Sequence, residues 1–131
     1  MKRTIGLLLV LALVAAACGD DDSADPLATC DGVAEATVDL VQDVIDELES
    51  MTPSEVGRLT QQGAEAFPAF AEIATRGDEL GTRIEELGCT DIDALVAEKA
   101  SRLEADPANG FTQLIVEGTR DGEDVLARLF R

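Results

Sequence analysis

The side chains that could carry out chemistry in this 131-residue chain are few in kind. Histidine is absent, which removes the commonest general base, any Ser-His triad and most metal sites. Carboxylates are plentiful, but a glycosidase cleft normally offers aromatic platforms, and the chain contains no tryptophan or tyrosine. No serine lies in a G-x-S-x-G setting. We therefore expect no enzyme activity, no catalytic residue, no bound metal and no cofactor.

Three cysteines remain as reactive side chains, and the first of them, Cys18, has a distinctive setting. It follows the basic residues Lys2 and Arg3, an apolar run at 5–17 and three consecutive alanines. The apolar run is roughly 20 Å long as a helix, well short of the ~30 Å hydrocarbon core of a membrane. A basic start, a short apolar run and small residues before a cleavage site are typical of an export signal, not of a membrane span.

The stretch LVAAACGDDD at 13–22 resembles the lipobox of bacterial lipoproteins. In that family the cysteine is acylated and the signal is cut before it, so the resemblance implies a lipid on Cys18. The position three before the cysteine, usually leucine, is Ala15 here. The resemblance implies a signal peptide at 1–17, a lipidated acidic tether at 18–28 and a protein anchored at the outer face of the cytoplasmic membrane. The alternative is an ordinary signal peptide that ends by chance at a cysteine.

With Cys18 assigned to lipid, Cys30 and Cys89 form an even pair in an exported protein, which favours a disulfide. The bridge would close a loop of ~60 residues, worth ~4 kcal/mol in the chain-entropy model. A redox pair is the alternative, but redox cysteines usually lie as C-x-x-C at the start of a helix. A zinc site is disfavoured because only two thiols and no histidine are present.

Acidic residues dominate the chain, with 27 Asp and Glu against 10 Lys and Arg and a net charge of −17. Removal of 1–17 would take away Lys2 and Arg3 and leave 8 basic residues and a net charge of −19. Because phosphate contacts need Lys and Arg, we expect no nucleic-acid partner. The membrane would then be bound through the lipid and not through charge. The remaining length suits one small domain at 29–131.

Hydrophobic periodicity predicts an all-α fold, a compact bundle of four to six short helices with one disulfide. The clearest helix covers 31–51, where apolar residues from Val33 to Met51 share one face and acidic residues occupy the other. Thr52 and Glu55 then predict a capping box at the start of a second helix.

The second helix is predicted to pass Pro68, which would bend it around the core, and to reach Ile73. A third helix is predicted over 78–87 and a fourth over 90–107. An antiparallel return of the third helix beside the second would leave Cys89 ~15 Å from the level of its disulfide partner. We therefore expect the third helix to cross the end of the bundle or to continue the line of the second.

The C-terminal part, 111–131, keeps one helical phase, and the sequence favours two short helices over a single one. Gly118 and Gly122 fall on the same side as the apolar residues, and Asp121 with Asp124 resembles the cap of a new helix. The residues predicted to share this buried face are Phe111, Leu114, Ile115, Val125, Leu126 and Leu129.

Lys99 is the one lysine of the predicted mature chain, and it falls within an apolar stripe between Val96 and Leu103. One interpretation is a stem lying on the core with its ammonium reaching an acid on a neighbouring helix. The other is a cation at the mouth of a ligand pocket.

Together these features indicate a non-catalytic helical domain held at the membrane, whose role would be interaction with another protein of the cell envelope. The alternative is a carrier of a small ligand or lipid that uses the interior of the bundle. In composition the body is similar to small, acidic, two-cysteine lipoproteins of actinobacteria, a resemblance that transfers no functional residue.

Overall fold

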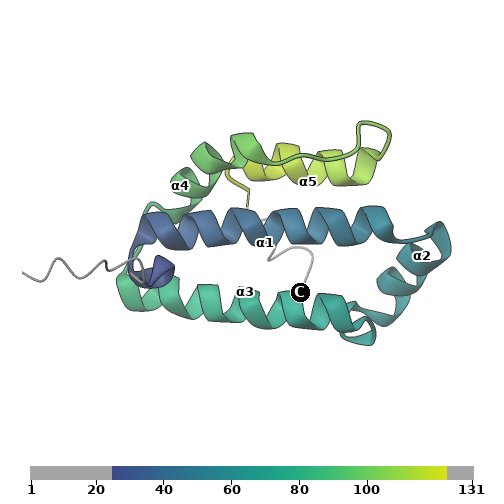
Figure 1. Ribbon diagram of the computed structural model, residues 1–131, viewed down its shortest axis with the longest axis horizontal. Coiled ribbons are helices and arrows are strands. Elements are labelled where there is room, and N and C mark those ends of the chain that lie inside the picture. Colours follow the sequence, from purple (N-terminus) through teal and green to yellow (C-terminus); the bar gives the residue numbers. More distant parts are fainter. Residues whose placement is uncertain (1–24, 124–131) are drawn as a thin grey trace, which may run out of the picture.

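The computed structural model describes residues 25–123, and within that range regular structure is helical throughout (Figure 1). The predicted all-α fold class with one disulfide is confirmed. The predicted signal peptide, Cys18 and the tether up to 24 lie outside the described residues, as does the segment 124–131.

The described elements follow one another along the chain as helices joined by short connections. They are η1 (Pro26–Ala28), α1 (Cys30–Ser50), α2 (Pro53–Gln62), η2 (Ala64–Ala66), α3 (Pro68–Leu87), α4 (Ile92–Lys99), η3 (Ala100–Arg102) and α5 (Gly110–Arg120). α1 lies between α3 on one side and α4 and α5 on the other, and both α3 and α5 run antiparallel to it (Figure 1). The molecule is thus layered around a single central helix.

α1 is that central helix. Its apolar stripe is wide because the helix packs against α3 on one side and against α4 and α5 on the other. Thr29 caps the helix, because its hydroxyl accepts a hydrogen bond from the Gly32 N–H at 3.1 Å. The helix predicted over 31–51 is confirmed, with a start one residue earlier and an end one residue earlier. Its buried side chains, each at most 4% exposed, are Val33, Ala34, Val38, Leu40, Val41, Val44, Ile45 and Leu48.

The chain reverses direction between α1 and α3, and here the structure differs from the prediction. α2 begins with the predicted capping box, in which the Thr52 N–H donates to the Glu55 carboxylate at 2.8 Å. It ends at Gly63, whose φ of 81° favours glycine, and does not reach Ile73. Pro68 starts α3 and does not bend α2, because proline suits the first turn of a helix, where its missing N–H breaks no helical bond.

α3 is one continuous helix of 20 residues, so 78–87 is not a separate helix. Of the two predicted paths for 78–87, the structure has the second, because this segment continues the helix that contains Phe70 and Ile73. Gly77 does not interrupt it, since a lone glycine costs a helix only ~1 kcal/mol. A Cβ at this glycine would lie 3.6 Å from the Leu40 side chain, an ordinary van der Waals contact, so Gly77 faces α1. α3 nearly equals the 21-residue α1 in length and runs back beside it (Figure 1). Cys89 therefore returns to the level of Cys30. No helix crossing the end of the bundle is needed.

α4 is shorter than the helix predicted over 90–107. It passes into η3 at Ala100, and the backbone becomes extended at Leu103, with φ −62° and ψ 133°. Ala100 and Leu103 are buried, whereas Ile92 and Val96 are only partly buried against the core. α4 therefore rests on α1 more shallowly than the sequence predicts.

α5 packs through a different face from the predicted one. Phe111 and Leu114, predicted to be buried, are 48% and 65% exposed. The Thr112 hydroxyl donates to Glu49 Oε1 at 2.8 Å, and the Thr119 hydroxyl donates to a carbonyl of the preceding turn at 2.8 Å. With their hydroxyls bonded, these threonines can be buried like small apolar side chains. The residues that α5 buries are Thr112, Ile115, Val116 and Thr119.

The fold begins earlier than the predicted domain boundary at 29. Leu27 of η1 packs against the core, and Asp25 accepts a hydrogen bond from Arg83 of α3 at 2.9 Å. Residues 25–28, predicted to be tether, therefore belong to the folded domain.

Candidate functional site

The two predicted disulfide cysteines are bonded to each other, with Cα atoms 5.7 Å apart. Cys30 opens α1, and Cys89 follows Gly88, whose φ of 65° ends α3. The N–H groups of Gly88 and Cys89 donate to carbonyls of the last turn of α3, which is the hydrogen-bond pattern of a Schellman cap. The bridge therefore joins the start of α1 to the turn between α3 and α4.

Lys99 lies at the end of α4, and its ammonium is 2.9 Å from Asp31 Oδ1 at the start of α1. The lysine side chain is 24% exposed and that of Asp31 is 67% exposed, so solvent reaches the pair mainly from the side of Asp31. The hydrogen bond to Asp31 raises the pKa of Lys99 above its ordinary 10.5, while partial burial acts in the opposite direction. This geometry matches the interpretation of a stem on the core with a charged end reaching a neighbouring acid.

Replacing Lys99 is expected to have a small effect that depends on pH. Because folding raises its pKa, the pair stabilises the fold below the ordinary lysine pKa and loses that stabilisation as pH rises through the higher folded value. Lys99→Met should therefore melt within a few degrees of the wild type at about pH 8 and show a smaller difference above about pH 11. Thermal unfolding of both proteins at the two pH values measures this.

A second substitution provides the control for that prediction. Lys99→Glu places a carboxylate beside Asp31 and Glu35 and should lower the melting temperature more than Lys99→Met does. Equal melting temperatures for the two variants would show that the charge at this position has no role in stability.

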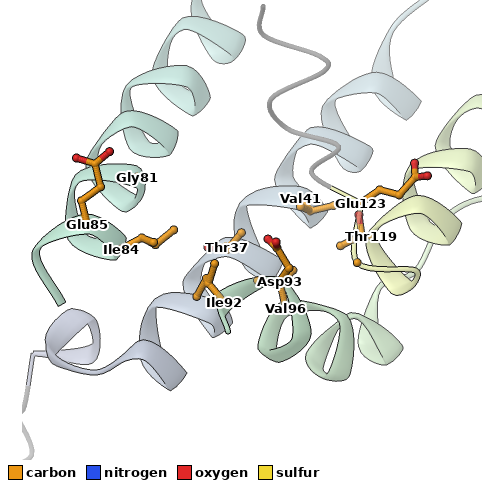
Figure 2. A pocket seen from close by; sticks show the side chains of 11 residues that line it. Thr37, Val41, Gly81, Ile84, Glu85, Ile92, Asp93, Val96, Thr119 and Glu123 are labelled. Carbon is orange, nitrogen blue, oxygen red and sulfur yellow. The ribbon is translucent and has the colours of Figure 1, made fainter. Parts of the chain in front are cut away.

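A groove of about 330 Å³ opens between α1, α3, α4 and the C-terminal turn of α5 (Figure 2). Ile84 extends from α3 toward Thr37 of α1 across the groove (Figure 2). Lys99 is not among the lining residues, so it does not supply a cation to this groove. The residues that line the groove are Thr37, Val41, Gly81, Ile84, Glu85, Ile92, Asp93, Val96, Thr119, Gly122 and Glu123.

The groove is lined by both aliphatic and acidic residues. The hydroxyls of Thr37 and Thr119 each donate to a carbonyl one turn earlier at 2.8 Å, so their protons are already engaged in helical hydrogen bonds. The aliphatic residues that line it are Val41, Ile84, Ile92 and Val96. The acidic residues that line it are Glu85, Asp93 and Glu123. This combination suits an occupant that is apolar on one side and positively charged on the other.

The turn that ends α5 forms part of this groove, because Gly122 and Glu123 are among the lining residues. Gly122 has a φ of 76°, and its N–H and that of Glu123 donate to carbonyls of α5 at 3.1 and 2.8 Å. This is again a Schellman cap, which reverses the chain at the end of a helix. A Cβ at Gly122 would lie 3.9 Å from the Asp93 carbonyl, so the turn packs against α4.

Comparisons with models of protein families, with characterised proteins and with solved structures give no match to this chain. Within 25–123, no three His, Cys, Asp or Glu side chains come together in a way that could hold a metal ion. None of the helices described in that range combines the length and apolar character needed to cross a membrane.

Sequence reasoning found the disulfide and the lysine but missed the groove. The sequence predicts core positions for Ile84, Ile92 and Val96, because their spacing is helical and their side chains are aliphatic. The signal that could have revealed the groove is Gly81, which leaves the α3 face without a side chain where a Cβ would meet nothing within 4 Å.

Proposed function

We propose that this chain is an exported bacterial lipoprotein whose helical domain binds another protein of the cell envelope. The observation that carries the binding role is the exposed apolar pair on α5, Phe111 and Leu114, which are 48% and 65% exposed. The two residues are three apart and share one side of the helix, while a neighbouring side packs on the core. Large apolar side chains gathered on one exposed face are typical of protein-interaction surfaces.

The proposed anchor rests on the lipobox-like stretch at 13–22. Expressed in a bacterium that processes lipoproteins, the chain should incorporate a palmitate analogue at Cys18 and fractionate with membranes. Cys18→Ala should abolish the label, whereas Cys89→Ser should keep it, because only the first cysteine lies in the lipobox-like setting. Labelling that persists in Cys18→Ala would contradict the anchor.

The binding role is tested by placing a photo-reactive amino acid at Leu114 in the membrane-bound protein. We expect cross-linked adducts of defined mass at this position and none from a matched position on α3, Glu72, which is also exposed. Phe111→Glu should remove the adducts and leave the melting temperature nearly unchanged, because its side chain is half exposed. Adducts formed equally from both positions would contradict a specific surface on α5.

The second candidate function is a carrier of a small apolar ligand, and the groove is the observation that favours it. Its volume of about 330 Å³ lies at the low end of the ~300–1,000 Å³ usual for ligand pockets. A neutral fluorescent apolar probe that binds the delipidated protein, and that no longer binds when Gly81→Phe fills the groove, would favour the carrier over the interaction module.

A further inference from the structure

The exposed side of α5 carries negative charge as well as an apolar pair. Phe111 and Leu114 are 48% and 65% exposed. Glu117 lies three residues beyond Leu114, and Asp121, the residue after the helix, lies two turns beyond it. Residues at this spacing share one side of a helix, and both acidic residues are exposed. The apolar pair is therefore followed along α5 by two carboxylates.

Acidic residues also lie beside the first turn of α5. Glu49, near the end of α1, accepts a hydrogen bond from the Thr112 hydroxyl at 2.8 Å and another from the Asp106 N–H at 2.6 Å. Glu49 and Asp106 are both exposed. Because Phe111 adjoins Thr112 in the chain, the apolar pair has acidic residues near both of its ends.

Within residues 25–123, no basic side chain offsets this charge. Arg120 of α5 is engaged elsewhere, since its guanidinium donates to the carbonyls of Ala100 and Leu103 at 3.2 and 3.0 Å. The other basic side chains of this range contact groups outside α5. They are Arg76 beside Asp43, Arg83 beside Asp25 and Glu86, Lys99 beside Asp31, Arg102 beside Glu35 and Asp39, and Arg58 over the Phe67 ring.

The apolar pair also lies at the end of the domain away from the point where the chain enters the fold. Asp25 pairs with Arg83 of α3, at the end of the molecule where α1 begins. Phe111 lies at the other end, where Glu49 of α1 meets Thr112. α1 has 21 residues and spans ~30 Å, so the two ends are well separated (Figure 1). The proposed anchor at Cys18 therefore attaches far from the pair.

We propose that Phe111 and Leu114 dock on a basic protein partner, an amphipathic helix whose apolar side is flanked by Lys or Arg. Such a helix can lie along α5 with its apolar side chains on the pair and its cations beside the carboxylates at either end. An anionic membrane or a second copy of this acidic chain would instead bring negative charge against Glu117 and Asp121.

The two kinds of group have different parts in this contact. The apolar pair supplies the centre of the interface, where water is excluded and most of the binding energy arises. The carboxylates around it select a basic partner and speed its association, an effect that salt weakens. The inference rests on the proposed binding role of α5 and adds the chemistry of the partner.

A synthetic amphipathic helix provides the first test. The probe peptide has leucine on one side and lysine on the other, and a matched peptide has glutamate in place of lysine. The full chain in nanodiscs of zwitterionic lipid should bind the lysine peptide and not the glutamate peptide, after correction for empty nanodiscs. Phe111→Ser should weaken binding of the lysine peptide about tenfold.

The charge around the pair is tested with the same peptide. Glu117→Gln should weaken its binding about two- to threefold and reduce the effect of added salt. The matched control is Glu72→Gln on α3, which removes the same charge from another exposed position and should change binding little. Equal binding by the wild type and Phe111→Ser, or of the lysine and glutamate peptides, would overturn the proposal.

The second test uses a photo-reactive amino acid at Leu114 in the membrane-bound protein. Glu117→Lys should lower the yield of cross-linked adducts severalfold, because it repels a basic partner. Glu72→Lys changes the net charge equally and should leave the yield unchanged. Equal losses in both variants would contradict a local effect of charge on α5.

The remaining outcomes of this experiment separate the present inference from the proposed function. Adducts whose yield neither variant changes would exclude the basic partner and leave the binding role of α5 standing. Absence of adducts from the wild type would remove both. Adducts of twice the mass of the chain would assign the pair to a second copy, and adducts with phospholipid would assign it to the membrane, and either would overturn the proposal.

Discussion

Reduction of the Cys30–Cys89 disulfide is expected to lower the melting temperature of the domain by roughly 10 °C or more. The bridge joins positions 59 apart in the sequence, and a loop of this length is worth ~4 kcal/mol by chain entropy, often less in practice. A loss of 1 kcal/mol shifts the melting temperature of a domain this size by ~4–8 °C, so even half of the full entropic stabilisation gives the expected shift. Calorimetry with and without reductant measures it.

The matched control for this prediction is the double variant Cys30→Ser with Cys89→Ser. It should melt where the reduced wild type melts, and added reductant should not change it. Two titratable thiols at these positions in the oxidised protein would contradict the bridge. Hydrogen exchange should show that the loss begins at the start of α1 and at the turn between α3 and α4, which the disulfide holds together.

Gly32→Ala is expected to destabilise the domain even though alanine favours a helix over glycine. Gly32 lies in the first turn of α1, and a Cβ there would overlap the carbonyl oxygen of Pro26. Because the obstacle is backbone, η1 would have to leave its place beside α1 and take Leu27 off the core. Overpacking of this kind costs ~1–3 kcal/mol, more than the ~1 kcal/mol of helix propensity that alanine adds. Denaturant unfolding measures the free energy of unfolding.

Gly57→Ala is the control, since it makes the same change in a helix where the added methyl meets nothing within 4 Å. It should stabilise the domain by ~0.5–1 kcal/mol. The two substitutions are therefore expected to act in opposite directions, and a stabilising Gly32→Ala would show that η1 does not press against α1.

Those features whose physics is local could be predicted from the sequence. α1 follows from a long run of apolar residues at helical spacing, and burial on both sides made the pattern strong. The start of α2 follows from Thr52 and Glu55, three residues apart, which bond to each other's backbone. Gly88 ends α3 because glycine, which has no Cβ, readily adopts the left-handed conformation that ends a helix.

The disulfide was predictable in identity but not in geometry. An even pair of cysteines after a predicted export signal indicates a bridge. The path that brings Cys89 to Cys30 depends on where the chain reverses, and Pro68 is compatible with either a bend or a start. The structure uses it as a start, which makes α3 long enough to return the full length of α1.

What the amino-acid sequence by itself determined is therefore the helical class, the central helix, the caps and the partners in the disulfide, because each depends on neighbours within one or two turns or on residue type alone. Only the tertiary structure decided the face of α5, since the buried Thr112 packs where its hydroxyl donates to Glu49, 63 positions away. It also decided the groove, because the lining residues come from α1, α3, α4 and the end of α5, which are distant in the sequence. Contacts between residues distant in the chain are not encoded in periodicity, which records only the side of a helix that avoids water.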